Sequence, residues 1–259
     1  MSVKLHSGRS GKGHPVVLLH GLFGSGNNLG SVARSLQDRY EVHSVDLPNH
    51  GRSGWTVQAD LGSIADCLRD WMLHHGLASA GFLGHSLGGK VAMQLALAHP
   101  ALVDALVVAD IAPVAYPPHH DNVFAGLDAV AAGQCRSRQA AAELMAAHIE
   151  EADVIQFLLM SLRREEDGFY RWRFNFEGIK RGYAAVRDAP VSAAPYRGPV
   201  QFIKGGESDY IREAHRSHTL ALFPQATVKV MPACGHWLHA QQPTLFNGIA
   251  GRFLDSHLS

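Results

Sequence analysis

A serine between glycines is the residue whose surroundings most clearly suggest catalysis. The stretch Gly84-His85-Ser86-Leu87-Gly88-Gly89 follows a short apolar run and opens a segment with helical character. In a strand–turn–helix setting, G-x-S-x-G forms a sharp turn that lifts the serine hydroxyl above the end of the strand. Glycines on both sides leave room for the close backbone approach that this turn requires. We therefore predict that Ser86 is the nucleophile of an acyl-transfer reaction.

A serine hydroxyl is a weak nucleophile at neutral pH and needs a base. His236 lies in Cys234-Gly235-His236-Trp237, directly after the last run with strand character. A loop at the carboxyl end of that strand would lie at the same sheet edge as Ser86. We predict His236 as the base, with His239 as the weaker alternative.

Two aspartates are candidates for the acid that orients this base. Asp110 follows the run Ala105–Val108, and Asp209 follows the run Val200–Ile203, so both lie at carboxyl ends of predicted strands. A carboxylate at either position would fix the tautomer of the histidine and stabilise its imidazolium form. Each aspartate could instead cap the helix that follows it. Their spacing does not decide between them.

Acyl transfer also needs N–H donors for the oxyanion of the tetrahedral intermediate. One predicted donor is the amide of Leu87, the residue after the nucleophile, and the second is expected in the loop after the first buried strand. That loop, residues 20–28, is rich in glycine, and Leu22 follows His20-Gly21. We assign Leu22 as the second donor and keep Phe23 as the alternative. The loop lacks the lysine and the Ser/Thr of a phosphate-binding P-loop.

The elements that must position these residues alternate along the chain. Between short apolar runs lie helical stretches at residues 28–37, 64–75 and 90–99. Such alternation predicts an α/β fold with a mostly parallel central sheet flanked by helices. Six runs have strand character: Val16–Leu19, Val42–Val45, Gly81–Leu83, Ala105–Val108, Val200–Ile203 and Val228–Met231.

This alternation stops between residues 113 and 195. Three prolines come first, followed by helical stretches at residues 122–132, 137–149 and 152–163, with an extended piece at 168–174. We predict a helical cap at 113–195, inserted into an α/β core formed by 1–112 and 196–259. An apolar helical stripe is more often packing than pocket lining, but six residues are candidates for substrate contact. They are Phe23, His85, Phe124, Phe157, Trp172 and Trp237.

The composition excludes several other classes of function. The 259 residues include 23 basic and 23 acidic ones without a basic stripe, so we expect no nucleic-acid partner. No apolar run is long enough to span a bilayer and no secretory signal is apparent, so we expect no membrane association and a cytoplasmic location. The 17 histidines show no metal-ligand spacing, and the three cysteines form no CxxC pair. We therefore expect neither metal nor cofactor, a small-molecule substrate, and a monomer or homodimer.

Taken together, these motifs resemble the α/β-hydrolase superfamily. More narrowly, residues 20–25, 49–51, 84–90, 110–114 and 171–175 resemble the YbfF-like esterases. The resemblance implies an α/β-hydrolase fold with a helical cap after the sixth strand of the family's sheet. It also implies a cofactor-free carboxylesterase that works through a Ser-His-Asp triad and an acyl-enzyme intermediate. Some members of the group act on acyl-CoA thioesters.

The resemblance bears on the choice of acid. The YbfF-like group places it at the Asp-Ile-Ala-Pro position, which is Asp110 here, whereas most of the superfamily places it after the seventh strand, which is Asp209 here. This chain departs from the narrower group by carrying an aspartate at both positions. We expect Asp110 to be the acid and keep Asp209 as the alternate.

Other functions on the same fold stay open. Serine at position 86 argues against the haloalkane dehalogenase and epoxide hydrolase branches, which use an aspartate there. A C–C bond hydrolase or lyase can use the same Ser-His-Asp set. A binding or receptor module with weak catalysis is a further alternative.

Overall fold

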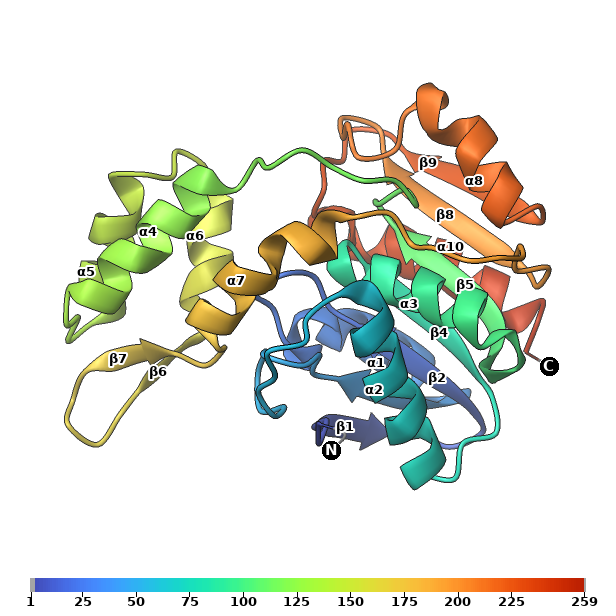
Figure 1. Ribbon diagram of the computed structural model, residues 1–259, viewed down its shortest axis with the longest axis horizontal. Helices are drawn as coiled ribbons and strands as arrows, with labels where there is room; N and C mark the ends of the chain where they lie inside the picture. The colour runs from blue at the N-terminus through green and yellow to red at the C-terminus, as the bar shows by residue number, and fades with distance from the viewer. Residues whose placement is uncertain (1–2, 259) are drawn as a thin grey trace.

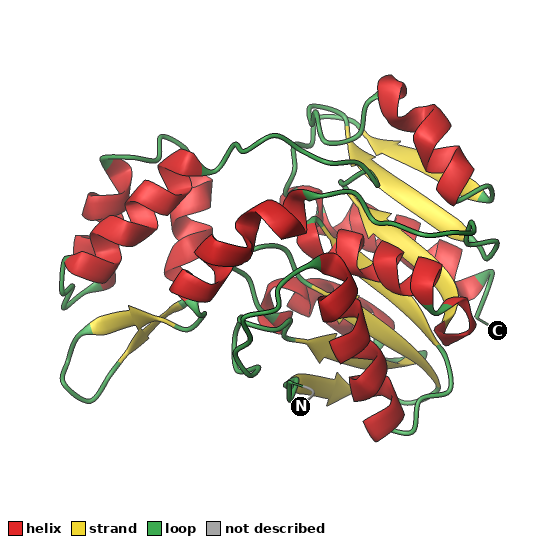
Figure 2. Cartoon of the chain, in the orientation of Figure 1, coloured by secondary structure: helices red, strands yellow, loops and turns green. Residues whose placement is uncertain are grey.

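A seven-stranded sheet runs through the molecule in the computed structural model, which describes residues 3–258 (Figures 1 and 2). The strand order is β1-β3-β2-β4-β5-β8-β9. Only the pair β1–β3 is antiparallel, and all other neighbouring strands are parallel. The strands are β1 (Ser7–Ser10), β2 (His14–Leu19), β3 (Tyr40–Val45), β4 (Ala80–His85), β5 (Val103–Ala109), β8 (Val200–Gly205) and β9 (Ala226–Met231).

The central strands are buried on both faces, which explains their continuous apolar runs. Every residue of β4 is buried, and β5 is buried except at Asp104. The predicted α/β fold with six strands at these runs is confirmed. The seventh strand, β1, was not predicted because Ser7-Gly8-Arg9-Ser10 contains no apolar residue. It pairs with β3 at the edge of the sheet, where a strand needs no buried side chains.

Helices cover the two faces of this sheet and create two apolar cores. On one face, α1 (Gly30–Leu36) contacts α10 (Pro243–Asp255), and Phe246 of α10 is fully buried against the strands. On the other face lie α2 (Leu61–His74), α3 (Leu87–Ala98) and α8 (Arg216–Leu222) (Figure 1). Short helices lie in the connections between these elements: η1 (Gly26–Leu29), η2 (Pro100–Leu102), η3 (Glu213–His215) and α9 (Leu238–Gln241).

The segment between β5 and β8 lies beside the sheet rather than in it (Figure 1). We refer to residues 113–195 as the inserted segment. It follows β5, the fifth strand along this chain. It contains α4 (Asp121–Ala132), α5 (Arg138–Ala146), α6 (Ala152–Leu159), the hairpin β6 (Leu162–Arg164) with β7 (Tyr170–Trp172), and α7 (Phe176–Arg187).

Two features of this segment differ from the sequence-based expectation. The helix expected at 152–163 ends at Leu159, because residues 162–164 pair with 170–172 as an antiparallel hairpin. Helix α7 was not predicted, although Asn175 caps it by accepting a hydrogen bond from the Gly178 amide. Within residues 3–258, no helix has the length and apolar character needed to cross a membrane.

Candidate active site

Ser86 occupies a sharp turn between β4 and α3. Its backbone has φ 52° and ψ −116°, values that are strained for a residue other than glycine. The turn is tight because a Cβ added at Gly84 would overlap the carbonyl oxygen of Gly88, and one added at Gly88 would overlap that of Leu19. Both glycines of the motif are therefore required by close backbone approach. The Ser86 amide also donates to the carbonyl of Ala109 at 3.0 Å, which fixes the turn to β5.

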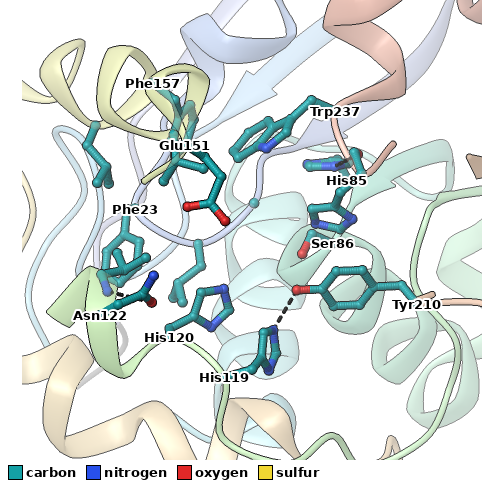
Figure 3. A pocket seen from close by; sticks show the side chains of 16 residues that line it. Phe23, His85, Ser86, His119, His120, Asn122, Glu151, Phe157, Tyr210 and Trp237 are labelled. Atoms are coloured by element: carbon teal, nitrogen blue, oxygen red, sulfur yellow. Dashed lines mark hydrogen bonds between the residues drawn. The ribbon is translucent and has the colours of Figure 1, made fainter. Parts of the chain in front are cut away.

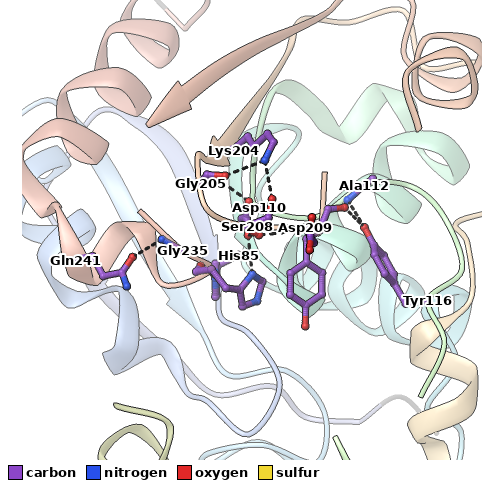
Figure 4. A network of polar contacts seen from close by, with 12 residues as sticks. His85, Asp110, Ala112, Tyr116, Lys204, Gly205, Ser208, Asp209, Gly235 and Gln241 are labelled. Atoms are coloured by element: carbon purple, nitrogen blue, oxygen red, sulfur yellow. Dashed lines mark hydrogen bonds and ion pairs between the residues drawn. The ribbon is translucent and has the colours of Figure 1, made fainter. Parts of the chain in front are cut away.

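His236 contacts Asp110. Its Nδ1 lies 2.8 Å from Oδ2 of Asp110. The Asp110 side chain is fully buried at the end of β5, beside Gly205 and Ser208 (Figure 4). The same carboxylate accepts hydrogen bonds from the Gly205 amide at 2.9 Å and from the Ser208 hydroxyl. Because an ionised carboxylate only accepts, Nδ1 of His236 carries the proton and Nε2 is left free to accept one.

Asp209 lies apart from this contact. Its side chain is 91% exposed, and its closest charged partner is Arg212 at 3.9 Å. The preceding residue, Ser208, points inward and donates to Asp110 instead. Of the two candidate acids, the structure brings Asp110 to the histidine and leaves Asp209 in solvent.

Aromatic rings hold His236 in place. The ring of Tyr210 stacks on it with a centroid distance of 4.1 Å and an interplanar angle of 24°. The ring of His85 lies 4.7 Å away, and its Nε2 donates to the backbone carbonyl of His236 at 2.9 Å. Burial lowers the pKa of His85 well below its ordinary value, so this ring stays neutral. The alternative base, His239, is buried beside His85, and burial lowers its pKa to about 4.

Ser86 and His236 line one cavity of about 230 Å³ between the sheet edge and the inserted segment (Figure 3). Its walls are of two kinds. The apolar lining residues are Leu22, Phe23, Val123, Val154, Phe157, Leu158 and Trp237. The polar ones, besides Ser86 and His236, are His85, His119, His120, Asn122, Glu151 and Tyr210.

Four of the six predicted substrate contacts line this cavity: Phe23, His85, Phe157 and Trp237. The other two, Phe124 and Trp172, do not, which corrects the expectation. The Phe124 ring packs edge-on against Phe23 at 5.5 Å, behind the pocket wall. Trp172 stacks on Phe174 at 5.2 Å and donates from Nε1 to the Leu127 carbonyl, so it belongs to the packing of the inserted segment.

Several lining residues were not singled out from the sequence. His119 and His120 are adjacent, and adjacent residues in a helix or strand point in different directions. Here the backbone is irregular, so both rings enter the pocket and lie 4.0 Å apart. Tyr210 follows Asp209 at a predicted strand end, a position that is itself a signal for site residues. Nothing in the sequence near Glu151 indicates that it lines the pocket.

The two predicted oxyanion donors face the same region. Leu22 and Ser86 line both the main cavity and a smaller one of about 40 Å³ that Leu87 also lines. In the described part of the chain, neither the Leu22 amide nor the Leu87 amide has a hydrogen-bond acceptor. Two N–H groups without acceptors beside a serine are suited to an oxyanion. His20 supports the loop, since its Nδ1 donates to the Gly21 carbonyl and its Nε2 accepts from the Leu47 amide.

Phe23, the alternative oxyanion residue, is contacted by the inserted segment. The Ser161 hydroxyl donates to the Phe23 carbonyl at 2.8 Å in a buried contact. The Phe23 ring packs against Phe124 and Phe174, both from the inserted segment. Phe23 also has a φ of 61°, which is unusual for an aromatic residue. The loop that carries the predicted donors is thus positioned from outside the sheet.

Within residues 3–258, no three His, Cys, Asp or Glu side chains lie close enough together to hold a metal ion.

The chain matches a family of known proteins over most of its length. The family model described as alpha/beta hydrolase fold matches residues 14–243. The chain belongs to the α/β-hydrolase family. It is 39% identical over 242 residues to esterase YbfF of Escherichia coli K12, covering 93% of each chain. It is 36% identical to the sn-1-specific diacylglycerol lipase ABHD11 of Mus musculus, over 92% of this chain and 80% of that one.

Solved structures agree with this membership of the α/β-hydrolase family. A marine microorganism esterase has a TM-score of 0.94 and 35% identity, over 98% of this chain and 100% of that one. The hydrolase of E-2-(acetamidomethylene)succinate has a TM-score of 0.80 at 22% identity, over 98% of this chain and 96% of that one, and shares the fold. The resemblance to the YbfF-like esterase group of α/β-hydrolases is confirmed.

Proposed function

We propose that this protein is a serine esterase that hydrolyses carboxylic esters of small molecules, with thioesters as a second substrate class. One observation carries the proposal. Ser86 and His236 line a single cavity, and His236 lies 2.8 Å from a buried carboxylate, Asp110. The esterase names of the relatives support the same reaction class.

The proposed reaction proceeds through an acyl-enzyme. Nε2 of His236 takes the proton of Ser86 as its Oγ attacks the carbonyl carbon of the ester. The amides of Leu22 and Leu87 donate to the oxyanion that forms. The imidazolium, stabilised by Asp110, then returns the proton to the departing alcohol or thiol. Water, deprotonated by the same histidine, hydrolyses the acyl-Ser86 ester and releases the acid.

We further propose that residues 113–195 act as the cap of this site. Helix α6 supplies Val154, Phe157 and Leu158 to the pocket, so the apolar wall comes largely from this segment. An acyl chain is held by apolar surface of this kind. The core, residues 1–112 and 196–259, supplies the proposed catalytic groups.

A labelling experiment tests the nucleophile. A fluorophosphonate probe is expected to label the wild type and not Ser86→Ala. Ser256→Ala, which alters a hydroxyl at the end of α10, is the matched control and is expected to be labelled normally. A wild type that is not labelled would favour the binding or receptor module.

A substrate series tests the reaction. The wild type is expected to hydrolyse p-nitrophenyl esters with a rate that depends on acyl length. Labelling of Ser86 without turnover of any ester or thioester would favour a C–C bond hydrolase or lyase over the esterase.

A further inference from the structure

Two cavities adjoin Ser86. The larger one, of about 230 Å³, is lined by one acidic side chain and, among its described lining residues, by no lysine or arginine, whereas Lys90 and Arg187 line the smaller one. That acidic residue is Glu151, at the start of α6. Figure 3 shows its carboxylate pointing into the pocket from the side of the inserted segment. A fixed charge on the wall of a cleft acts on every charged group of a ligand that enters it.

In the described chain, the carboxylate of Glu151 takes part in no capping hydrogen bond and no ion pair. Glu151 is the N-cap residue of α6, yet its carboxylate accepts no capping hydrogen bond. In residues 3–258 it forms no salt bridge. Glu151 is exposed, and its carboxylate is therefore available to a ligand.

Two of the histidines that line the pocket are neutral, because burial disfavours the imidazolium form. Burial lowers the pKa of His120 to about 3 and that of His85 well below its ordinary value. His119 lies with Nδ1 2.9 Å from the Pro117 carbonyl oxygen and Nε2 2.6 Å from the Tyr210 hydroxyl oxygen. Among the described residues that line the larger cavity, Glu151 is the one with a carboxylate side chain.

We propose that Glu151 selects substrates by charge. Esters with a cationic group close to the scissile bond are favoured over uncharged esters of the same shape, and uncharged esters are favoured over anionic ones. The proposal rests on the proposed esterase function and names the substrate class of that site. Glu151 is exposed to water, which weakens its electrostatic effect. Each unit change in the charge of the ester is therefore expected to change kcat/KM by about three- to tenfold. High salt should reduce the effect.

Three acetate esters test the proposal, because they differ in charge and little in shape. Acetylcholine, 3,3-dimethylbutyl acetate and the acetate ester of isethionate share an ethylene spacer. They end in a trimethylammonium, a tert-butyl and a sulfonate group. The two measured quantities are the kcat/KM ratios of cationic to neutral ester and of neutral to anionic ester, which cancel general effects on catalysis.

Two variants decide the outcome. Glu151→Gln removes the charge and keeps the shape, and both ratios are expected to fall by about three- to tenfold. Glu150→Gln removes the same charge from the neighbouring residue, which does not line the pocket, and is expected to keep the wild-type ratios. Wild-type ratios in Glu151→Gln, or an equal change in Glu150→Gln, would overturn the assignment.

A protein that lacks the proposed esterase activity requires a different measurement of charge selection. If the wild type hydrolyses none of the three esters, charge selection is measured by calorimetric binding of the intact esters to Ser86→Ala. Adding Glu151→Gln to that variant should then reduce the preference for the cation. Equal affinities for all three esters in Ser86→Ala would overturn charge selection as well.

Discussion

The carboxylate of Asp110 is held by three donors from three parts of the chain. The Gly205 amide comes from the end of β8, the Ser208 hydroxyl from the loop beyond it, and the His236 ring from the loop after β9. A buried charge is tolerated only when it is fully hydrogen-bonded. This arrangement stabilises the negative charge that the proposed imidazolium needs beside it.

Replacing Asp110 tests this role at the level of one side chain. Asp110→Asn is expected to lower kcat by about 10³- to 10⁴-fold, because an amide nitrogen facing Nδ1 favours the wrong tautomer of His236. Steady-state kinetics on a p-nitrophenyl ester measures the change. The matched variant Asp209→Asn alters an exposed carboxylate and is expected to stay within about twofold of wild type. The opposite ranking would assign the acid to Asp209.

Some residues of the site could be predicted from the sequence, and others could not. Ser86, His236 and both aspartates could be found because they follow apolar runs at strand ends. The direction of a side chain beyond a strand end is set by the path of the loop, which no local pattern encodes. That is why Asp209 turns to solvent although its neighbours Ser208 and Tyr210 contact Asp110 and His236. It is also why Trp172 packs inside the inserted segment.

Among the elements, the turn between β4 and α3 depends most strictly on its glycines. Gly88→Ala is expected to destabilise the protein by about 2–4 kcal/mol, because the new methyl group would overlap the Leu19 carbonyl in a backbone contact that cannot relax without moving β2. Denaturant unfolding gives the difference. Gly8→Ala is the control, since a Cβ there meets nothing within 4 Å. An equal effect of both substitutions would mean that the close approach is not what limits position 88.

Ser161, between α6 and β6, forms a second contact that a substitution can test. Ser161→Ala removes the donor to the Phe23 carbonyl and is expected to lower kcat by about three- to tenfold, as a hydrogen bond of this kind contributes about 1 kcal/mol. The loop that carries the proposed oxyanion donors then loses its support. Ser161→Thr keeps a hydroxyl and should recover most of the turnover. Unchanged kcat in Ser161→Ala would show that the sheet alone holds the loop.

Element boundaries were predictable where the pattern was apolar and regular. Helix α4 begins and ends within one residue of the predicted stretch 122–132. Helix α6 ends earlier than predicted because the hairpin of β6 with β7 uses the backbone groups of residues 162–164. The edge strand β1 pairs with β3, more than thirty residues away, and its polar residues show no strand-like periodicity.

At the scale of the whole molecule, Lys90 connects the core to the inserted segment. Its Nζ donates to the backbone carbonyls of Arg187 at 2.6 Å and Asp188 at 2.7 Å, where α7 ends and the chain returns to the sheet. The side chain is 3% exposed, and burial lowers the pKa of Lys90 to about 7. The protonated amine is thus disfavoured in the folded state.

This pKa predicts how stability depends on pH. Between pH 7 and about 10, the unfolded chain holds a proton on Lys90 that the folded chain lacks, so stability rises with pH in this window. Relative to Lys90→Met, the wild type is expected to gain on the order of 1 kcal/mol per pH unit from pH 7 to 9. Paired unfolding curves at pH 7, 8 and 9 measure the difference. A constant difference would mean that Lys90 stays charged in the folded protein.

Two backbone contacts of the site continue the hydrogen-bond ladder of the sheet. The Ser86 amide donates to Ala109, and the Asp110 amide donates to Ile203, both just past the last residues of their strands. Deuterium reaches such amides only when the strands separate. These two positions should therefore be among the slowest in the chain to exchange, and heating should abolish ester hydrolysis only at the temperature at which the sheet itself comes apart.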